Sequence, residues 1–204
     1  MERKTINAEW IDYRRDFRLY DPSCPKQTIA YADDLERERK DHPEYIISED
    51  RILYLAYGSN MNHSQMARRC PLAAFVAPYI LEDYALKFRG TDGHCVATIE
   101  QEKGRHVPAA LWKISASDEK SLDSYEGFPH LYSKIYLQTQ YGATMTYVMN
   151  KRPLGRPSEE YLSIIAEGYL NCKFSDTTPL IESAVMSAVS NSIKEGTEDE
   201  EQEH

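Results

Sequence analysis

The hydrophobic positions of the chain take on the spacing of β-strands from residue 51 onward. Residues 51–57, RILYLAY, form a short aliphatic and aromatic run without a helical period, which predicts a strand buried on both faces. Further short β-rich runs follow at residues 74–79, 84–89, 96–101, 107–114, 132–139 and 144–149. Glycines stand in several of the turns and only brief helical stretches intervene, so the pattern favours a small barrel over a sheet of βαβ units.

Helical signals lie between these strands and after them. Residues 117–125 begin with a serine cap and two acidic residues and are followed by Gly127, which predicts a short helix. In the C-terminal third, the string PSEE predicts a helix that runs to about Gly168. Thr178 and Pro179 predict the start of another helix, because proline favours the first helical position. Its apolar stripe consists of Ile181, Val185, Ala188 and Val189.

Residues 1–50 differ from the rest because they are rich in charge and poor in apolar periodicity, which indicates an N-terminal extension. Within it, residues 32–40 predict a short exposed helix with acidic residues in its first turn and basic residues in its last. Aromatic residues recur at intervals of three and four positions, at Trp10, Tyr13, Phe17 and Tyr20. This spacing predicts a helix whose apolar face packs over the barrel as an arm or lid.

The chain ends in an acidic stretch. Residues 195–204, EGTEDEEQEH, have no hydrophobic content with which to fold, so we expect a disordered acidic tail. The predicted organisation is therefore an extension at residues 1–50, one domain at residues 51–194 and the tail. A chain of 204 residues has room for one domain of ordinary size with appendages.

The overall charge narrows the classes of partner. A formal net charge of −9 and an isoelectric point near 5.2 argue against binding to nucleic acid or to an anionic membrane, because phosphate groups need clustered basic residues. The first residues, MERKTINAEW, do not resemble a signal peptide, and no apolar run approaches the roughly 20 residues of a spanning helix. We therefore expect a cytoplasmic protein whose partner is a small molecule or another protein.

Cysteines and histidines are scattered rather than clustered. The four cysteines contain no C-x-x-C pair, which favours reduced, mostly buried thiols over a zinc site or a disulfide framework. No H-E-x-x-H, G-x-S-x-G, P-loop or G-x-G-x-x-G string occurs. The common signatures of metal, triad and nucleotide sites are thus missing, and the sequence predicts neither a metal nor a cofactor.

The first candidate for chemistry is the turn that ends the strand at residues 51–57. Gly58, Ser59 and Asn60 break the apolar run, and the helix-forming string NHSQMARRC follows. A tight turn of this kind directs several backbone N–H groups toward one point, which suits a carboxylate, a phosphate or an oxyanion. The same residues are also typical of an ordinary turn at the end of a strand.

The second candidate is the string LDSYEGFPHLY. It places Glu126 where the short helix ends and the chain turns through Gly127 and Pro129 into a strand. A glutamate at a helix end is usually a solvated surface residue. Aromatic neighbours on both sides favour partial burial here, and burial raises a carboxyl pKa toward the range that is useful for proton transfer.

Taken together, these strings resemble the gamma-glutamyl cyclotransferase-like superfamily. The matching segments, in the family's order and at comparable spacing, are YLAYGSNM with RCP, ATIEQEKGRHVPAALWKIS, SLDSYEGFPHLYSK, TYVMN and PSEEYLSIIAEGYL. The resemblance covers about residues 51–170 and implies an α+β fold, a small mixed β-barrel with flanking helices. It also implies release of 5-oxoproline from a gamma-glutamyl amine or peptide.

The resemblance assigns roles to particular residues. Glu126 matches the family's catalytic glutamate, which moves a proton from the attacking α-amine to the leaving amine. Tyr57, Gly58, Ser59 and Asn60 would bind the gamma-glutamyl group through backbone N–H groups, and Tyr132 and Tyr147 would line the cavity. Because the substrate's own amine is the nucleophile, the reaction needs no protein nucleophile, metal or cofactor.

Some positions leave alternatives open. Tyr132 and Tyr147 are equally typical of ordinary strand tyrosines, and Arg68 and Arg69 resemble a basic pair of the family but also suit a solvated helix end. Many bacterial members carry arginine where this chain has Lys134. Two other functions remain: removal of a gamma-glutamyl protecting group from a specialised metabolite, and a non-catalytic binding or scaffold module on the same barrel. The sequence does not identify the amine or the oligomeric state.

Overall fold

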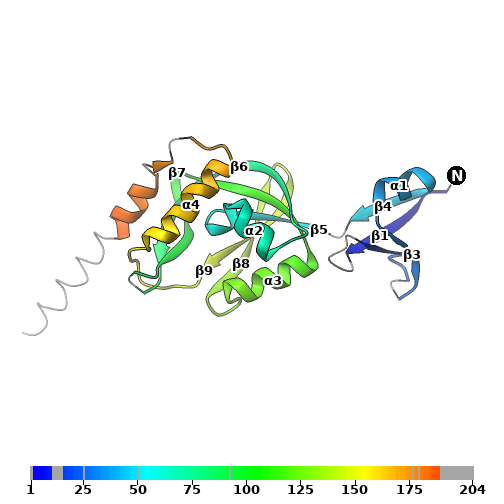
Figure 1. The fold of residues 1–204 in the computed structure, drawn as a ribbon, viewed down its shortest axis with the longest axis horizontal. Coiled ribbons are helices and arrows are strands. Elements are labelled where there is room, and N and C mark those ends of the chain that lie inside the picture. The colour runs from blue at the N-terminus through cyan, green and yellow to red at the C-terminus, as the bar shows by residue number, and fades with distance from the viewer. Residues whose placement is uncertain are drawn as a thin grey trace, which may run out of the picture.

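The structure is a computed structural model, and it describes residues 2–10, 16–24, 26–49, 51–91, 93–175, 177–178 and 180–188. Two separate sheets organise these residues (Figure 1). A four-stranded sheet forms from the N-terminal segment, and a five-stranded sheet forms from the part of the chain after residue 50. The structure therefore confirms the α+β class.

The N-terminal segment is a small sheet with one helix. Its elements are β1 (Lys4–Trp10), β2 (Phe17–Tyr20), β3 (Thr28–Ala32), α1 (Leu35–Asp41) and β4 (Tyr45–Glu49). The strand order is β3-β2-β1-β4, with β1 and β4 parallel and the other pairs antiparallel. Its buried residues form their own cluster, which includes Ile6, Phe17, Leu19 and Leu35.

The prediction of a helix from the spacing of the N-terminal aromatic residues is wrong. Trp10 ends β1, and Phe17 and Tyr20 bound β2, while Tyr13 lies outside the described residues. In β2, alternate residues are buried, as in a strand with one face on a core. The unit lies beyond one end of the central sheet rather than over it (Figure 1), so the expected lid over the barrel is not observed. The expected helix at residues 32–40 does form, as α1, with Asp34 as its N-cap.

The second unit is built on a mixed five-stranded sheet. Its strands are β5 (Arg51–Ala56), β6 (Ala74–Arg89), β7 (Val96–Ser115), β8 (Tyr132–Thr139) and β9 (Gly142–Met149). The order is β6-β7-β5-β9-β8, in which β5 and β9 are parallel and the remaining neighbours are antiparallel. Within the described residues, the hydrogen-bonded order begins at β6 and ends at β8, so the expected mixed sheet is present but it does not close into a barrel.

Two pairs of predicted strands are each one long strand. The runs at 74–79 and 84–89 are both part of β6, and those at 96–101 and 107–114 are both part of β7. The register shifts between Glu82 and Tyr84, where Asp83 takes a positive φ of 61° and its carboxylate accepts a hydrogen bond from the Gly104 amide at 2.8 Å. Gly104 therefore belongs to an irregularity within a long hairpin, not to the predicted turn.

Helices flank this sheet (Figure 1). They are the 3₁₀ turn η1 (Ser59–Met61), α2 (His63–Arg69), α3 (Ala116–Glu126) and α4 (Glu159–Asn171). Ser158 caps α4 as the string PSEE predicts. A Cβ on Gly168 would lie 2.8 Å from the Asn62 amide nitrogen and 2.9 Å from Met61 Cβ, so this glycine allows α4 to cross η1 closely.

The C-terminal end of the described chain is also helical. Residues 180–188 adopt helical structure, and Ala184 and Ala188 are buried there. Ile181 and Val185 pack against the same core while remaining partly exposed, as the predicted stripe requires. The predicted stripe residue Val189 and the acidic tail at 195–204 lie outside the described residues. Among the helices that the structure describes, none has both the length and the apolar character that a membrane crossing requires.

Candidate functional site

The turn after β5 forms one wall of a small cavity. In η1, the Met61 amide donates to the Gly58 carbonyl at 2.9 Å and the Asn62 amide donates to the Ser59 carbonyl at 3.1 Å. These are the first donors inside the turn, so the amides of Ser59 and Asn60 have no acceptor within it. A Cβ on Gly58 would lie 3.2 Å from Ala97 Cβ and 3.3 Å from Tyr161 Oη, so glycine allows these two residues to pack closely against the turn.

The end of α3 delivers Glu126 to the same cavity. The helix begins with a capping box, in which Ser115 and the buried Asp118 each satisfy a backbone amide of the other. It ends at Gly127, whose φ of 64° is the left-handed conformation that glycine adopts most easily. Capping at both ends fixes where α3 stops, and therefore where the carboxylate of its last residue lies.

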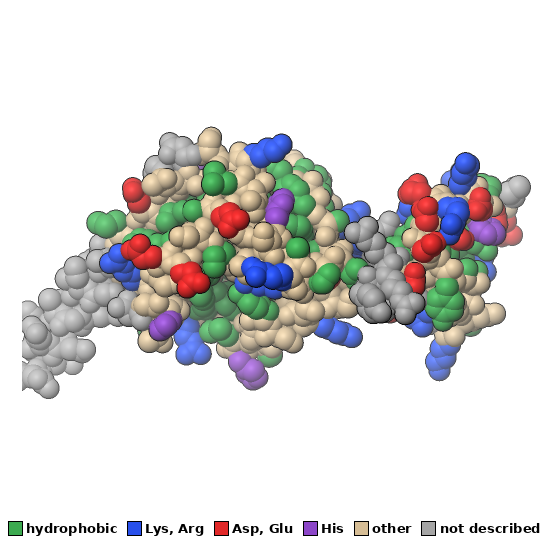
Figure 2. All heavy atoms as spheres, in the orientation of Figure 1, with side chains coloured by type: hydrophobic (Ala, Val, Ile, Leu, Met, Phe, Trp, Pro, Cys, Tyr) green, Lys and Arg blue, Asp and Glu red, His purple; other side chains and the backbone are tan. Residues whose placement is uncertain are grey.

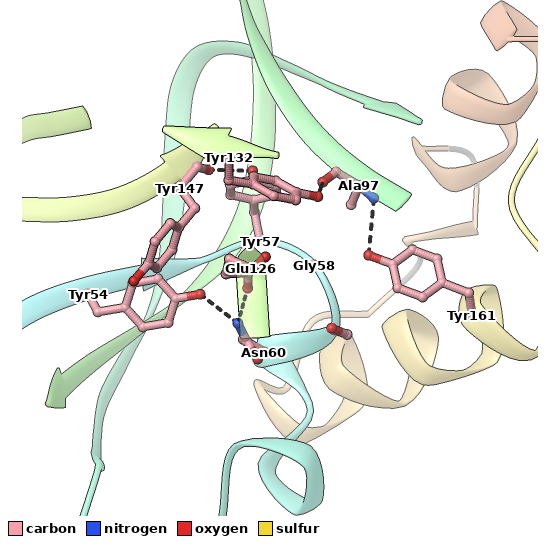
Figure 3. A pocket seen from close by; sticks show the side chains of 10 residues that line it. Tyr54, Tyr57, Gly58, Asn60, Ala97, Glu126, Tyr132, Tyr147 and Tyr161 are labelled. Atoms are coloured by element: carbon pink, nitrogen blue, oxygen red, sulfur yellow. Dashed lines mark hydrogen bonds between the residues drawn. The ribbon is translucent and has the colours of Figure 1, made fainter. Parts of the chain in front are cut away.

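Asn60 links the turn to Glu126. Its Nδ2 donates to Glu126 Oε1 at 2.8 Å and to Tyr54 Oη at 2.8 Å. Figure 3 shows the Asn60 amide between these two oxygens. Its Oδ1 accepts from Arg69 Nη1 at 2.5 Å. Both ends of the amide are therefore engaged, and Glu126 receives one hydrogen bond from a neutral donor.

The electrostatics of this cavity suit proton transfer. Burial raises the pKa of Glu126 to about 7, although the Asn60 hydrogen bond and the positive charge of Arg69 act in the opposite direction. The residue is partly exposed, but the carboxyl group lies at a cavity formed largely by aromatic side chains. A carboxyl with this pKa exists in both protonation states near neutral pH, so it can accept a proton and release it again.

Tyrosines make up most of the remaining wall. The cavity, of about 30 Å³, is lined by Tyr54, Tyr57, Gly58, Ser59, Asn60, Ala97, Glu126, Tyr132, Tyr147 and Tyr161. Tyr57 Oη donates to the Tyr147 carbonyl at 2.5 Å, and Tyr132 Oη donates to the Ala97 carbonyl at 2.8 Å. Burial raises the pKa of Tyr57 and of Tyr132, and the charge of Glu126 adds to this effect. These hydroxyls therefore remain protonated and serve as hydrogen-bond groups.

A second set of contacts holds α3 against β8 and β9. Lys134 Nζ lies 2.5 Å from Glu119 Oε1 and 2.7 Å from Asp123 Oδ1, and Tyr147 Oη donates to Asp123 Oδ1 at 2.6 Å. Lys134 thus faces α3 rather than the cavity. Its two ion pairs connect the helix that carries Glu126 to the sheet.

The structure brings together every residue that the sequence singled out for the site. Tyr57, Gly58, Ser59, Asn60, Glu126, Tyr132 and Tyr147 all line the one cavity. Sequence reasoning missed Tyr54, Ala97 and Tyr161, and it treated Arg69 as a residue of a solvated helix end. Tyr54 lies in the strand that precedes the turn, but Ala97 and Tyr161 approach only through the packing of β7 and α4.

A second, larger cavity is lined in part by the segments that begin β7 and lead into β8. It has a volume of about 620 Å³, and its lining includes Arg89, His94 and Arg152 together with apolar side chains. Residues of the two walls are consecutive in the chain: Ala97 and Tyr132 line the small cavity, and Val96 and Leu131 line the large one. Among the residues that the structure describes, no group of three or more His, Cys, Asp or Glu side chains could hold a metal ion.

Comparisons with known proteins indicate one family. The family model described as "Gamma-glutamyl cyclotransferase, AIG2-like" matches residues 54–170. Gamma-glutamylcyclotransferase of Homo sapiens is 33% identical over 133 residues, which cover 59% of this chain and 71% of that protein. The Mus musculus protein of the same name is 30% identical over 132 residues, or 58% of this chain and 70% of its own length.

Solved structures give the same result. A gamma-glutamyl cyclotransferase structure with 32% sequence identity superposes with a TM-score of 0.53, covering 59% of this chain and 79% of its own. The structure of YkqA from Bacillus subtilis, at 18% identity, superposes with a TM-score of 0.54 over 71% of this chain and 55% of its own. At that level of identity, the second comparison supports the fold alone.

Proposed function

The chain belongs to the gamma-glutamyl cyclotransferase, AIG2-like family, and from this premise we propose that its Glu126 catalyses the release of 5-oxoproline from a gamma-glutamyl amine or peptide. The family and the relatives indicate an enzyme of the gamma-glutamyl cyclotransferase type. One observation supports the assignment of the site above all others. A carboxyl with a pKa of about 7 shares a small cavity with Ser59 and Asn60 of the η1 turn.

The proposed reaction closes a five-membered ring. The α-amine of the gamma-glutamyl group attacks the γ-carbonyl carbon, a C–N bond forms, and the bond from that carbon to the leaving amine breaks. Glu126 takes the proton that the α-ammonium must lose before it can attack, and it returns a proton to the leaving nitrogen. One carboxyl performs both steps because its pKa lies close to neutral pH.

The turn would stabilise the charge that develops during attack. The amides of Ser59 and Asn60, which have no acceptor within η1, are the donors that we assign to the gamma-glutamyl group and its oxyanion. The loss of one such donor typically removes about 3–4 kcal/mol of transition-state stabilisation. Tyr57, Tyr132 and Tyr147 complete the wall and would bind the substrate through their rings and hydroxyls.

Substrate folding supplies the rest of the rate. Holding the α-amine against the γ-carbonyl makes the attack intramolecular, an effect that amounts to roughly 7–11 kcal/mol in the best cases. A rigid cavity with many hydrogen bonds among its own wall residues favours this kind of positioning, because few side chains need to reorganise when the substrate binds.

We expect the amine half of the substrate to extend toward the larger cavity. The small cavity has a volume of about 30 Å³, which is too small for a whole gamma-glutamyl dipeptide. The larger cavity has room for a leaving group, and its arginines Arg89 and Arg152 favour one that carries a carboxylate. Arg89 is already paired with Glu100, so Arg152 is the stronger candidate.

A substrate panel tests the proposal. The purified chain is incubated with gamma-glutamyl dipeptides, with gamma-glutamyl alkylamines that lack a carboxylate, and with N-acetylated versions of both, and 5-oxoproline is measured by mass spectrometry. We expect product from the free-amine compounds, with dipeptides preferred, and none from the acetylated ones because their nucleophile is blocked. Absence of product from every compound would contradict the proposed activity and favour a binding module.

A further inference from the structure

The last side chain of α2, Arg69, binds four groups with one guanidinium. Its Nη1 donates to Ser59 Oγ at 3.0 Å and to Asn60 Oδ1 at 2.5 Å. Its Nη2 donates to Gln65 Oε1 at 3.0 Å and to Tyr125 Oη at 2.5 Å, and its Cζ lies 3.7 Å from the centre of the Tyr125 ring. One residue thus connects α2, the η1 turn and the end of α3.

These contacts determine how Asn60 faces Glu126. An amide has a donor end and an acceptor end, and Arg69 offers only donors, so Asn60 Oδ1 must face the guanidinium. Nδ2 is then directed at Glu126 Oε1, 2.8 Å away. Without Arg69, the amide loses the partner that favours this orientation over the reverse. The reverse orientation would set the Asn60 oxygen against the Glu126 carboxylate.

The guanidinium is also the charged group that acts on Glu126. The titratable groups that surround the carboxyl are five tyrosines, from β5 and the residue after it, β8, β9 and α4, and the thiol that follows α2. They are Tyr54, Tyr57, Tyr132, Tyr147, Tyr161 and Cys70. Burial raises the pKa of all six, so they stay neutral across roughly pH 5 to 8. In this range Arg69 keeps its positive charge, so the charge that acts on Glu126 in the free enzyme is that of Arg69.

We propose that Arg69 is a positioning residue that fixes the Asn60 amide toward Glu126 and favours the carboxylate form of the base. The inference rests on the proposed function, because it concerns the same carboxyl and the same turn. Arg69 does not line the cavity, and its four hydrogen bonds from Nη1 and Nη2 are all to protein groups. Its effect on the reaction therefore passes through Asn60 and through its charge.

The test compares three variants with the wild-type enzyme. Arg69→Met removes the donors and the charge, Arg69→Lys keeps the charge but not the planar fork, and Arg68→Met removes an equal charge from the neighbouring exposed position of the same helix. For each, kcat and kcat/KM for 5-oxoproline release are measured from pH 5 to 9, together with the thermal unfolding midpoint.

We expect kcat to fall roughly tenfold to a hundredfold in both Arg69 variants, because Glu126 and the η1 turn are no longer held in their positions relative to each other. In Arg69→Met, the acid limb of kcat/KM should also move upward by about one pH unit, because an adjacent positive charge that favoured the carboxylate is gone. Arg69→Lys should move this limb much less. Arg68→Met should resemble the wild type in both measurements.

An acid limb that stays in place in Arg69→Met, with kcat close to that of Arg68→Met, would overturn the role of Arg69 while leaving the proposed function intact. A wild-type enzyme that releases no 5-oxoproline would instead overturn the proposed function. If Arg69→Met does not fold, Arg69→Lys decides: a normal kcat in that variant would show that the four-way hydrogen bonding is not needed.

Discussion

The two sheets of this protein bury different kinds of residue. Among the residues that the structure describes, the N-terminal sheet buries only apolar side chains, namely Ile6, Ala8, Phe17, Leu19, Ala32, Leu35 and Ile47. Its charged residues lie on the surface, where acidic and basic side chains are mixed (Figure 2). In the second unit, by contrast, buried polar residues stand beside the apolar core: Ser59, Asn60, Asn62, Thr98, Ser115, Asp118, Thr139, Thr144 and Thr146.

The difference separates residues that hold a fold from residues that perform chemistry. A buried polar group destabilises a fold by about 1–3 kcal/mol unless it is hydrogen-bonded, so a chain that buries several needs partners for each. In the second unit one such set of partners lies at the cavity, the chain from Arg69 through Asn60 to Glu126. Among the described residues of the N-terminal sheet and its helix, no polar or charged residue is buried.

The largest effect should come from removing the charge at the centre of that network. Glu126→Gln keeps the length of the side chain and can still accept the hydrogen bond from Asn60, but it cannot take the α-ammonium proton. We expect kcat for 5-oxoproline release to fall by about 10²–10⁴, with a much smaller change in KM if the η1 amides bind the substrate. A variant that retains near wild-type turnover would show that Glu126 is only a helix-end residue.

The next largest effect should come from replacing Gly168, which has no side chain that could take part in the reaction. In Gly168→Ala, the new Cβ would meet backbone atoms of Met61 and Asn62 at 3.0 and 2.8 Å, so η1 has to move away from α4. We expect kcat to fall by roughly a hundredfold for a displacement of about 1 Å. The free energy of unfolding should also decrease by about 1–3 kcal/mol.

The matched control for this glycine is Glu167→Ala, at an exposed position of the same helix. Alanine is about 1 kcal/mol better than glycine in a helix interior, so Gly168→Ala would be stabilising if nothing stood in its way. Greater stability with unchanged turnover would mean that α4 does not set the position of the turn.

Much of this fold and site could be predicted from the sequence because the signals are local. The break after residues 51–57, the serine cap and C-terminal glycine of α3, and the PSEE start of α4 each depend on a few neighbouring residues, and all were placed to within a few positions. The joint presence of the YGSN turn and Glu126 then identified a single cavity from two distant strings.

Contacts between distant elements could not be predicted in this way. The two halves of β6 read as separate strands because the irregularity at Asp83 and Gly104 carries the residues of a turn. The N-terminal aromatic stripe fits a helical period, yet Phe17 and Leu19 alternate with partly exposed residues in a strand that pairs with β1 and β3. Arg69 looks like a solvated helix end until the turn and α3 surround it.

A smaller effect should appear in the pH dependence of stability. The pKa of Glu126 rises from 4.5 to about 7 on folding, so the folded state favours the protonated carboxyl. The stability that this provides is present below pH 4.5 and is lost as the pH rises through 7. Relative to Glu126→Gln, the wild type should therefore lose about 2 kcal/mol of unfolding free energy between pH 4.5 and 8, a value reduced for partial exposure.

Urea unfolding of both proteins at several pH values measures this difference. A matched control is Glu119→Gln, because Glu119 lies on the same helix but pairs with Lys134 and does not line the cavity. If the curves of wild type and Glu126→Gln run parallel from pH 4.5 to 8, the carboxyl is not desolvated and the proposed basis for its raised pKa is wrong.

The smallest effect on catalysis should come from deleting the N-terminal sheet. The N-terminal sheet and the second unit have cores that share no residue, and the family match begins at residue 54, after the last strand of that sheet. We therefore propose that residues 1–49 form a unit that the reaction does not use. A chain beginning at residue 50 should keep kcat and KM within about twofold, because changes away from a site usually alter free energies by no more than about 0.5 kcal/mol. The measurement is 5-oxoproline release by the shortened and full-length chains at equal concentration, with thermal unfolding as the control for folding. A large loss of turnover at an unchanged unfolding midpoint would show that the N-terminal sheet contributes to the site. The difference in buried residues would then not separate a structural unit from a catalytic one.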